Sequence, residues 1–422
     1  LNELFMRWPM LLAGIAAILL LPFLLRHWLT APERVLLAAL IAISPFLIYY
    51  SRFARPYMPV ALLEIAALVL AWHWWKTGRL VHVIGWILCA SFATWLNPPA
   101  LAIVTAPFVC FGLLGLRDVR HPRGRRNLLR LLVTGLAMLG ALVALLGPPL
   151  AGDYGSIVTK AGQHSVTWTS LGWTLSLAVG SGHRWIYVPV GLLALYGLYS
   201  LHQRDPGFAR FVVTVLILAM IAVTLTRPDW IEQGPVFLRY LIGMLPFFLG
   251  CVAIGTVRAA SWLFRRFGEH SLVVPGACAV VALLLVASGP VPAWPFFQNQ
   301  FLTHLYYHFH YDPERNPFVS FIGGWYQEEP YYAEIAREHP KGDAVVVEAP
   351  WYLESFNNAL HLQQSVHGQR VVVGFVNGLC SGPLYGEIRT GQPGMNFQSF
   401  VDVRDLLNET RSADYLVLHR RS

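Results

Sequence analysis

The sequence predicts a membrane protein that is all-α in its membrane part, with a C-terminal α/β domain outside the membrane. Three observations predict this fold class. Hydrophobic residues make up 55% of the 422 residues and charged residues only 13%, which is too apolar for a soluble protein of this size. About ten apolar stretches suited to membrane helices follow one another before residue 290. From residue 291 onward, short Val-rich runs alternate with amphipathic segments, so we expect two domains, 1–290 and 291–422.

The ten predicted membrane helices are windows of consecutive apolar residues bounded by polar, Pro-rich or basic turns. Their predicted ranges are 8–29, 35–50, 57–75, 80–96, 100–116, 128–147, 185–201, 211–226, 237–255 and 272–288. The connections between them alternate between the two faces of the membrane. The longest connection, 148–184, and the short connection 51–56 are both predicted on the same face.

Basic residues predict the orientation, because cytoplasmic loops carry an excess of Lys and Arg. One set of alternate loops holds fifteen basic residues and the other set holds six. The first set includes a six-arginine loop between residues 117 and 130, which lacks the Gly-rich cradle of a nucleotide site and which we attribute to topology and anionic lipids. The other face, which carries residues 291–422, is therefore predicted to be outside, and the protein is predicted to lie in a bacterial inner membrane.

The C-terminal region has the strand and helix order of a small, largely parallel α/β domain. Strands are predicted at 343–350, 370–376 and 413–419, and helices at 325–338 and 352–364. The sequence stops just after the third strand, so this domain is expected to be incomplete.

Several classes of function are disfavoured by composition. The net charge of +8 is distributed over alternating loops rather than one basic surface, which argues against a nucleic-acid partner. Four of the five cysteines lie in apolar stretches, so no disulfide framework is predicted. His304, His308 and His310 lack an acidic residue at metal-motif spacing, and no Gly-rich dinucleotide motif opens a helix, so neither a metal nor a cofactor is expected.

Two Arg-Tyr groups on the predicted outer face are the main candidate site. Arg52, Arg55 and Tyr57 occupy the short 51–56 connection and its end, and Arg239 and Tyr240 lie at the outer start of the ninth predicted helix. An arginine fork binds phosphate with two hydrogen bonds, and a neighbouring tyrosine adds a hydroxyl. The two groups together are predicted to hold a phospholipid-like head. The alternative is ordinary anchoring, in which the arginines extend to lipid headgroups beside an interfacial tyrosine belt.

Two further sets of polar residues are weaker candidates. Asp153, His164 and Trp168 lie in the predicted outer loop 148–184 and suit contacts to a sugar or an acceptor, although a solvated loop with interfacial tryptophans has the same composition. Glu64 lies inside the third predicted helix, where a carboxylate is costly. It is either functional or a structural partner of a neighbouring helix.

Three stretches carry a resemblance to a known family. They are Arg-Trp-Pro-Met-Leu-Leu at 7–12, Ser-Pro at 44–45 followed by Tyr-Ser-Arg-Phe-Ala-Arg-Pro-Tyr at 50–57, and Phe-Leu-Arg-Tyr-Leu-Ile-Gly-Met-Leu-Pro-Phe at 237–247. In these the sequence resembles the polytopic GT-C glycosyltransferases, which include the protein O-mannosyltransferases and the aminoarabinose transferase that modifies lipid A. The resemblance covers residues 1 to about 260.

The resemblance implies transfer of a sugar from a polyprenyl-phosphate carrier to a protein, lipid or glycan at the outer face. It implies that Arg52, Arg55 and Tyr57 line the carrier site and that Arg239 and Tyr240 approach its phosphate. In the family, an acidic residue in the first outer loop acts as acid/base or positions the acceptor. That loop is expected upstream of Leu1, together with the first membrane helix, so the catalytic residue is unassigned in this sequence.

Two other functions remain open at this stage. A transporter of lipid-linked sugars would use the same arginines, but the sequence shows no internal repeat of the kind that many transporters contain. A noncatalytic membrane scaffold would use the outer α/β domain to bind partners. The expected partners in the transferase interpretation are membrane lipids and a polyprenyl-phosphate-linked sugar, with the acceptor unknown.

Overall fold

The computed structural model describes ten segments of the chain. They are residues 3–52, 55–159, 165–181, 183–228, 231–267, 272–289, 330–349, 364, 366–372 and 413–418. The chain divides into two compact units: unit 1 comprises Leu1–Gly147 and Lys160–Phe309, and unit 2 comprises Pro148–Thr159 and His310–Ser422. The predicted domain boundary at 290/291 falls outside the described residues, and the two units are considered separately below.

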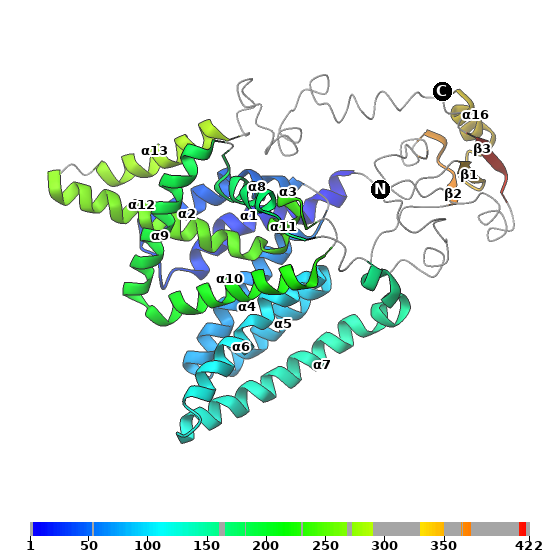
Figure 1. Cartoon of the computed structure of the whole chain (residues 1–422). Coiled ribbons are helices and arrows are strands. Elements are labelled where there is room, and N and C mark those ends of the chain that lie inside the picture. The colour runs from blue at the N-terminus through cyan, green and yellow to red at the C-terminus, as the bar shows by residue number, and fades with distance from the viewer. Residues whose placement is uncertain are drawn as a thin grey trace. The chain divides into compact units, whose positions relative to one another are not determined.

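Unit 1 is helical (Figure 1). Its first helices are α1 (Glu3–Leu24), α2 (Ala31–Ile43), α3 (Pro45–Arg52), α4 (Tyr57–Thr77), α5 (Leu80–Leu96), the 3-10 turn η1 (Pro98–Ala100) and α6 (Leu101–Arg117). They are followed by α7 (Pro122–Thr159), whose last residues belong to unit 2, then α8 (Trp168–Val179), α9 (Arg184–Arg204) and α10 (Pro206–Thr226). The last are α11 (Gly234–Tyr240), the 3-10 turn η2 (Ile242–Met244), α12 (Leu245–Phe267) and α13 (Val273–Ser288).

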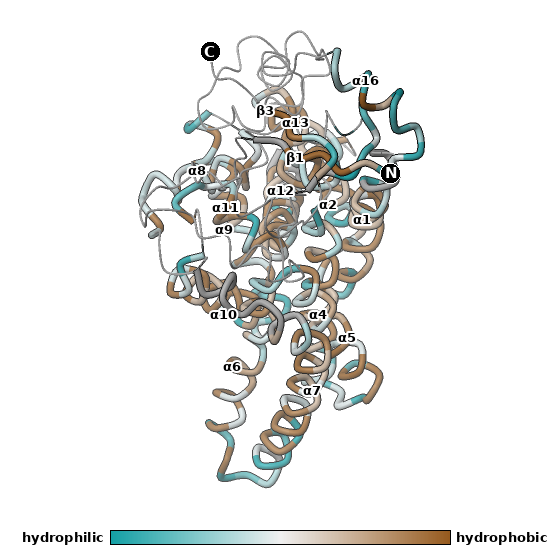
Figure 2. The backbone as a smooth tube through the Cα atoms, turned by 90° about the vertical axis from the view of Figure 1, so that its right-hand side faces the viewer, coloured by the Kyte–Doolittle hydropathy of each residue, from teal (hydrophilic) through white to brown (hydrophobic). Residues whose placement is uncertain are grey.

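The chain is an integral membrane protein. Among the described residues, seven helices are long and apolar enough to cross a bilayer, and the bent pair α2 and α3 adds an eighth if it forms one span. Two shorter apolar helices are α5 and α13. Figure 2 shows mostly hydrophobic residues along α5 and α7 and hydrophilic residues at the turn between α6 and α7. Large apolar side chains are exposed along α7 at Leu132, Leu136, Leu139 and Val143, as expected of a surface that faces lipid.

Proline breaks two of the helices that the sequence predicts as continuous. The predicted helix 35–50 bends by 59° between α2 and α3. Ser44 has an extended ψ of 114° because Pro45 disfavours the helical conformation of the residue before it, and Pro45 itself starts α3. The predicted helix 237–255 is likewise divided into α11, η2 and α12, with Pro246 in the first turn of α12.

The structure corrects the expectation that residues 148–184 form a loop, because the described part of this range is largely helical. Helix α7 continues to Thr159, and α8 forms over Trp168–Val179. A capping box starts α8, in which the Thr167 hydroxyl accepts a hydrogen bond from the Ser170 backbone and the Ser170 hydroxyl accepts one from the Thr167 backbone. Ser170 occupies the position that Glu or Gln holds in the usual capping-box sequence, so the sequence alone does not indicate this capping box.

Helices α4 and α12 form the centre of unit 1. In the α12 span 78% of the residues are buried and in the α4 span 61%, against 17% in the α7 span. Helices α9 and α12 pack with their backbones in contact, because a Cβ on Gly197 would overlap the Cys251 carbonyl and one on Gly255 would overlap the Leu193 carbonyl. Small residues allow this close approach where lipid surrounds the helices.

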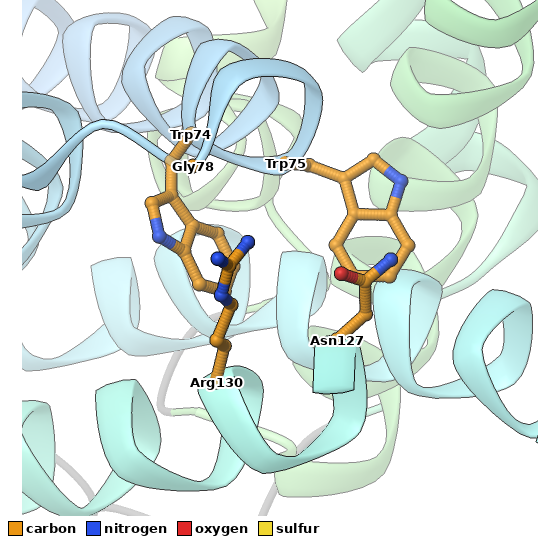
Figure 3. Close-up of a pocket in the computed structure, with 5 residues that line it drawn as sticks. All are labelled: Trp74, Trp75, Gly78, Asn127 and Arg130. Carbon is orange, nitrogen blue, oxygen red and sulfur yellow. The ribbon is translucent and has the colours of Figure 1, made fainter. Parts of the chain in front are cut away.

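The C-terminal end of α4 packs against α7 through aromatic and polar side chains (Figure 3). Trp74, Trp75, Gly78, Asn127 and Arg130 surround a cavity of about 10 Å³, enough for roughly one water molecule. The Arg130 guanidinium lies beside Trp74 at the negative end of the α4 dipole, where a cation is stabilising.

A buried ion pair joins α2 to the end of α9. Arg204 Nη1 and Nη2 donate to the two carboxylate oxygens of Glu33 at 2.7 and 2.5 Å, and Nη1 also donates to the Trp28 carbonyl at 2.8 Å. Trp28 Nε1 donates to Asp205 at 3.1 Å, and the Trp28 and His73 rings lie 5.7 Å apart. The α1–α2 turn, the α9–α10 turn and the end of α4, which the charge count assigns to one membrane face, therefore meet at one end of the bundle.

The described part of unit 2 contains α16 (Pro330–Glu338) and a sheet of three parallel strands in the order β2-β1-β3. The strands are β1 (Val345–Ala349), β2 (Arg370–Val372) and β3 (Tyr415–Leu418). Val345 pairs with Arg370, and Val346 pairs with Tyr415. All three lie within the predicted strands, whereas the predicted helix 352–364 falls almost entirely outside the described residues.

The ion pair is expected to stabilise the folded protein. Glu33→Gln should lower the free energy of unfolding by about 2 kcal/mol, because Arg204 is left without its counter-charge; Arg204 is 21% exposed, so the cost falls below that of a fully buried pair. Unfolding of the purified protein in mixed detergent micelles, followed by circular dichroism, measures this change. Asp118→Asn, at an exposed position between α6 and α7, is the control and should have no effect. An unchanged stability of Glu33→Gln would contradict the role given to the pair.

Candidate functional site

An arginine surrounded by tyrosines lies where α11 meets the α3–α4 connection. We call Arg239, Tyr240, Tyr50 and Tyr57 the Arg-Tyr cluster. Arg239 Cζ lies 5.7 Å from the ring centroid of Tyr57 and 5.0 Å from that of Tyr240, and Arg239 Nη2 donates to the Tyr240 hydroxyl at 3.1 Å. The Tyr50 and Tyr57 rings are 4.6 Å apart in an edge-to-face arrangement. Two segments nearly 200 residues apart in sequence therefore form one aromatic site around a cation.

The Arg239 guanidinium is only partly satisfied. Its Nε is buried and has no hydrogen-bond partner in the described part of the chain, and no carboxylate pairs with it there. The residue as a whole is partly exposed. A buried charged donor without a partner is costly, and an anion that bound there would relieve the cost.

The other predicted arginines lie next to this cluster. Arg52 is the last residue of α3 and is half-buried, and Arg55 is exposed in the connection to α4. The Arg55 backbone carbonyl accepts a hydrogen bond from the Tyr57 backbone at 2.9 Å, so Arg55 adjoins the cluster. The structure thus places Arg55 beside Tyr57, and Arg239 against the Tyr57 and Tyr240 rings. Tyr49 and Tyr50 lie in the predicted stretch but were not predicted as site residues.

Helix α8 fixes the start of α11. The Ser170 hydroxyl donates to the Glu232 carbonyl at 2.6 Å, and the Thr174 hydroxyl donates to the Gly234 carbonyl at 3.2 Å. Gly234 packs directly on Trp173, whose Cβ lies 2.6 Å from where a Cβ on Gly234 would be. Nothing in the sequence pairs these two segments, so this support for Arg239 was not predicted.

Glu64 makes a second link between α4 and the segment that carries Arg239. It is 1% exposed, and a Cβ on Gly243 would overlap its carboxylate. The Gly243 backbone is the hydrogen-bonding group that the carboxyl faces, while Oε2 has no partner among the described residues. Of the two interpretations left open by the sequence, contact with a neighbouring segment is the one that this geometry supports. Glu64 is a positioning residue for η2 and, through it, for α11.

The remaining predicted residues do not join the cluster in the described structure. Trp168 is the first residue of α8 and is 89% exposed. Asp153 lies in α7, but its side chain is outside the described part of the structure, as are His164 and the three histidines at 304, 308 and 310. Within the described ranges, no group of three His, Cys, Asp or Glu side chains is placed to hold a metal ion.

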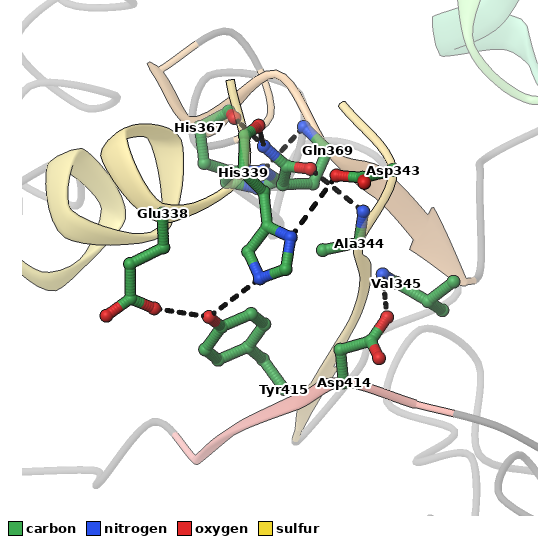
Figure 4. Close-up of polar contacts among 9 residues, drawn as sticks. All are labelled: Glu338, His339, Asp343, Ala344, Val345, His367, Gln369, Asp414 and Tyr415. Atoms are coloured by element: carbon green, nitrogen blue, oxygen red, sulfur yellow. Dashed lines mark hydrogen bonds and ion pairs between the residues drawn. The ribbon is translucent and has the colours of Figure 1, made fainter. Parts of the chain in front are cut away.

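Unit 2 has a polar network of its own (Figure 4). Tyr415 donates to Glu338 at 2.5 Å, and the two ring nitrogens of His339 lie 3.1 Å from the Tyr415 hydroxyl and 3.2 Å from Asp343. Gln369 Nε2 also donates to the His339 carbonyl at 2.8 Å. The network lies at the amino ends of the strands, whereas open parallel sheets bind ligands at the carboxyl ends. We therefore regard it as structural.

The contact between Gly243 and Glu64 is testable. Gly243→Ala should destabilise the protein by about 1–3 kcal/mol, because the added methyl group has to displace the Glu64 side chain. Gly250→Ala is the matched control on α12, since its Cβ would meet nothing within 4 Å. In a double-mutant cycle, Glu64→Ala should recover part of the loss. Equal effects of the two glycine substitutions would contradict the proposed contact.

The polar network in unit 2 is expected to change the pH at which the Tyr415 phenol ionises. The hydrogen bond to Glu338 raises the pKa of Tyr415 to about 12, from an ordinary value of 10.0. The raised pKa favours the neutral phenol, so its contribution to stability is present below about pH 10 and is lost as the pH rises through 12. The absorbance titration at 295 nm of the protein minus that of Tyr415→Phe should show one phenol ionising near pH 12. In Glu338→Gln the absorbance change from Tyr415 should move towards pH 10. A Tyr415 absorbance change that already occurs at pH 10 in the parent would contradict the hydrogen bond.

Comparison with known proteins does not assign the chain to a family. No protein-family model matches it, and no curated protein matches it. The inference of function therefore depends on the Arg-Tyr cluster, the membrane helices and the resemblance carried by the sequence stretches around them.

Proposed function

We propose that the protein is a membrane glycosyltransferase of the GT-C type that transfers a sugar from a polyprenyl-phosphate carrier to a protein, lipid or glycan acceptor. The observation that carries this proposal is the Arg-Tyr cluster. Arg239 lies against the Tyr57 and Tyr240 rings at one end of a bundle of apolar helices, and its buried Nε has no hydrogen-bond partner among the described residues, which suits a phosphate attached to a long apolar chain. The phosphate pairs with Arg239, and the apolar chain lies along the neighbouring helices.

The proposed chemistry follows from the charge that develops on the carrier. When the bond between the sugar and the phosphate breaks, negative charge accumulates on the phosphate oxygens. Fixed cations near these oxygens stabilise that charge more in the transition state than in the ground state. Arg239 and Arg55 supply the cations, and Tyr57 and Tyr240 line the site. The carboxylate that deprotonates the acceptor hydroxyl is not assigned, because Glu64 is buried against Gly243.

The proposal includes the location of the protein. We infer ten membrane spans, counting the bent pair α2 and α3 as one and including the shorter helices α5 and α13. The excess of basic residues in alternate loops supports an outer position for the Arg-Tyr cluster. On this basis the protein lies in a bacterial inner membrane, and the sheet of β1, β2 and β3 belongs to an α/β domain outside it.

Binding of the carrier tests this function. Arg239→Gln should weaken binding of undecaprenyl phosphate to the purified protein at least tenfold, since a charge-assisted hydrogen bond is worth about 1.5–3 kcal/mol. Arg239→Lys keeps the charge but loses the planar fork, so its affinity should lie between those of Arg239→Gln and the parent. Isothermal titration in detergent measures the dissociation constants.

A matched control separates a specific site from general attraction to an anionic lipid. Arg184, at the exposed start of α9, carries the same charge in another loop of the predicted outer set. Arg184→Gln should bind undecaprenyl phosphate as the parent does. Parent-like binding by both Arg239→Gln and Arg55→Gln would show that the cluster is not the carrier site, and the transferase proposal would lose its support.

A further inference from the structure

A second cavity lies at the other end of unit 1 from the Arg-Tyr cluster. It has a volume of about 480 Å³, is open to the surface, and is lined by the α1–α2 turn, the end of α9 and the second half of α12. Helix α4 runs from one site to the other. Tyr57 at its start belongs to the Arg-Tyr cluster, and His73, sixteen residues later, contacts His27 and Trp28 beside the cavity. At 1.5 Å per helical residue, the two sites are about 24 Å apart. The cavity is therefore distinct from the proposed carrier site.

The charged groups of the cavity leave one cation without a counter-charge. The Glu33 carboxylate is neutralised by two hydrogen bonds from Arg204 and accepts a third from the Thr30 backbone at 2.7 Å. Arg258 also lines the cavity, and within the described residues it makes no hydrogen bond or ion pair. The lining thus carries two guanidinium groups and one carboxylate, a net formal charge of +1.

The size and the walls of the cavity indicate more than a bare ion. Sites for small molecules typically have volumes of about 300–1,000 Å³, and this cavity lies within that range. Trp28 and Val257 supply apolar wall next to the two arginines, and Ser261 adds a hydroxyl at the edge. An anion that also carries carbon atoms matches this combination better than inorganic phosphate does.

We propose that this cavity binds a phosphate ester, with Arg258 as its main cationic contact and Trp28 and Val257 packing on the ester carbons. Arginine is suited to this ligand because its planar fork donates two hydrogen bonds to phosphate oxygens. An anionic phospholipid headgroup is the nearest source, since the cavity lies at the end of helices whose apolar side chains face lipid. A soluble phosphate ester offers the same chemistry, and the experiment distinguishes the two sources.

Native mass spectrometry of the full chain in detergent tests the site with two probes, dioleoylphosphatidylglycerol and glycerol 3-phosphate. Arg258→Gln should weaken binding about tenfold, and Arg258→Lys should weaken it less. Arg26→Gln is the matched control, because Arg26 lies at the same end of the bundle but is exposed, with its guanidinium 4.1 Å from the Phe23 ring. It should bind as the parent does. Ser261→Phe, which fills the cavity edge and leaves Arg258 in place, should also weaken binding.

The two probes give different outcomes for the two sources. Binding of dioleoylphosphatidylglycerol that depends on Arg258 supports the site with a lipid as its ligand. Binding of glycerol 3-phosphate with the same dependence supports the site with a soluble ester. The proposal is overturned if neither probe binds, or if Arg26→Gln weakens binding as much as Arg258→Gln does. Parent-like binding by both Arg258→Gln and Ser261→Phe also overturns it.

Discussion

A charge that is removed from water in a bundle of apolar helices is costly unless a counter-charge and hydrogen bonds compensate it. In unit 1 the pair of Glu33 and Arg204 meets this constraint fully: both carboxylate oxygens accept from the guanidinium, and the Trp28 carbonyl accepts as well. The pair connects residues that are 171 positions apart, so it also holds the α1–α2 turn against the end of α9. At this end of the bundle, the helices therefore have to be arranged so that Glu33 and Arg204 can pair.

Helix breaks place polar residues where continuous helices would not. Pro45 bends the chain by 59° after α2, so that α3 ends beside α4 and brings Tyr50 against Tyr57. The division of α11 from α12 turns Arg239 towards the same tyrosines, and η2 fits against Glu64 because Gly243 has no side chain. The two breaks together build the Arg-Tyr cluster, and α8 supports it through hydrogen bonds to the Glu232 and Gly234 carbonyls.

Hydropathy and charge in the sequence were sufficient to predict a membrane protein with long apolar helices, and Val-rich runs were sufficient to locate three strands. These properties belong to consecutive residues, so they can be read from a short stretch of the sequence. The 59° bend, the pairing of Glu33 with Arg204 and the contact of Gly243 with Glu64 depend on which helices are neighbours, and no short stretch contains that information. Arg239 and Tyr57 were predicted because arginine is conspicuous between apolar stretches. Ser170 and Thr174 were not, since hydroxyl residues are common in any loop.

Arg204 and Arg239 differ in a way that bears on function. Arg204 donates to a carboxylate and to a carbonyl of the protein, so its charge has a partner within the chain. Among the described residues, Arg239 has a tyrosine hydroxyl and two aromatic faces as its partners, and its buried Nε has none. Tyrosine faces attract a cation less strongly than a carboxylate does, so they hold the guanidinium in place without neutralising it. An arginine that is fixed but not neutralised is suited to an anion that binds and leaves, as a carrier phosphate has to do in each catalytic cycle.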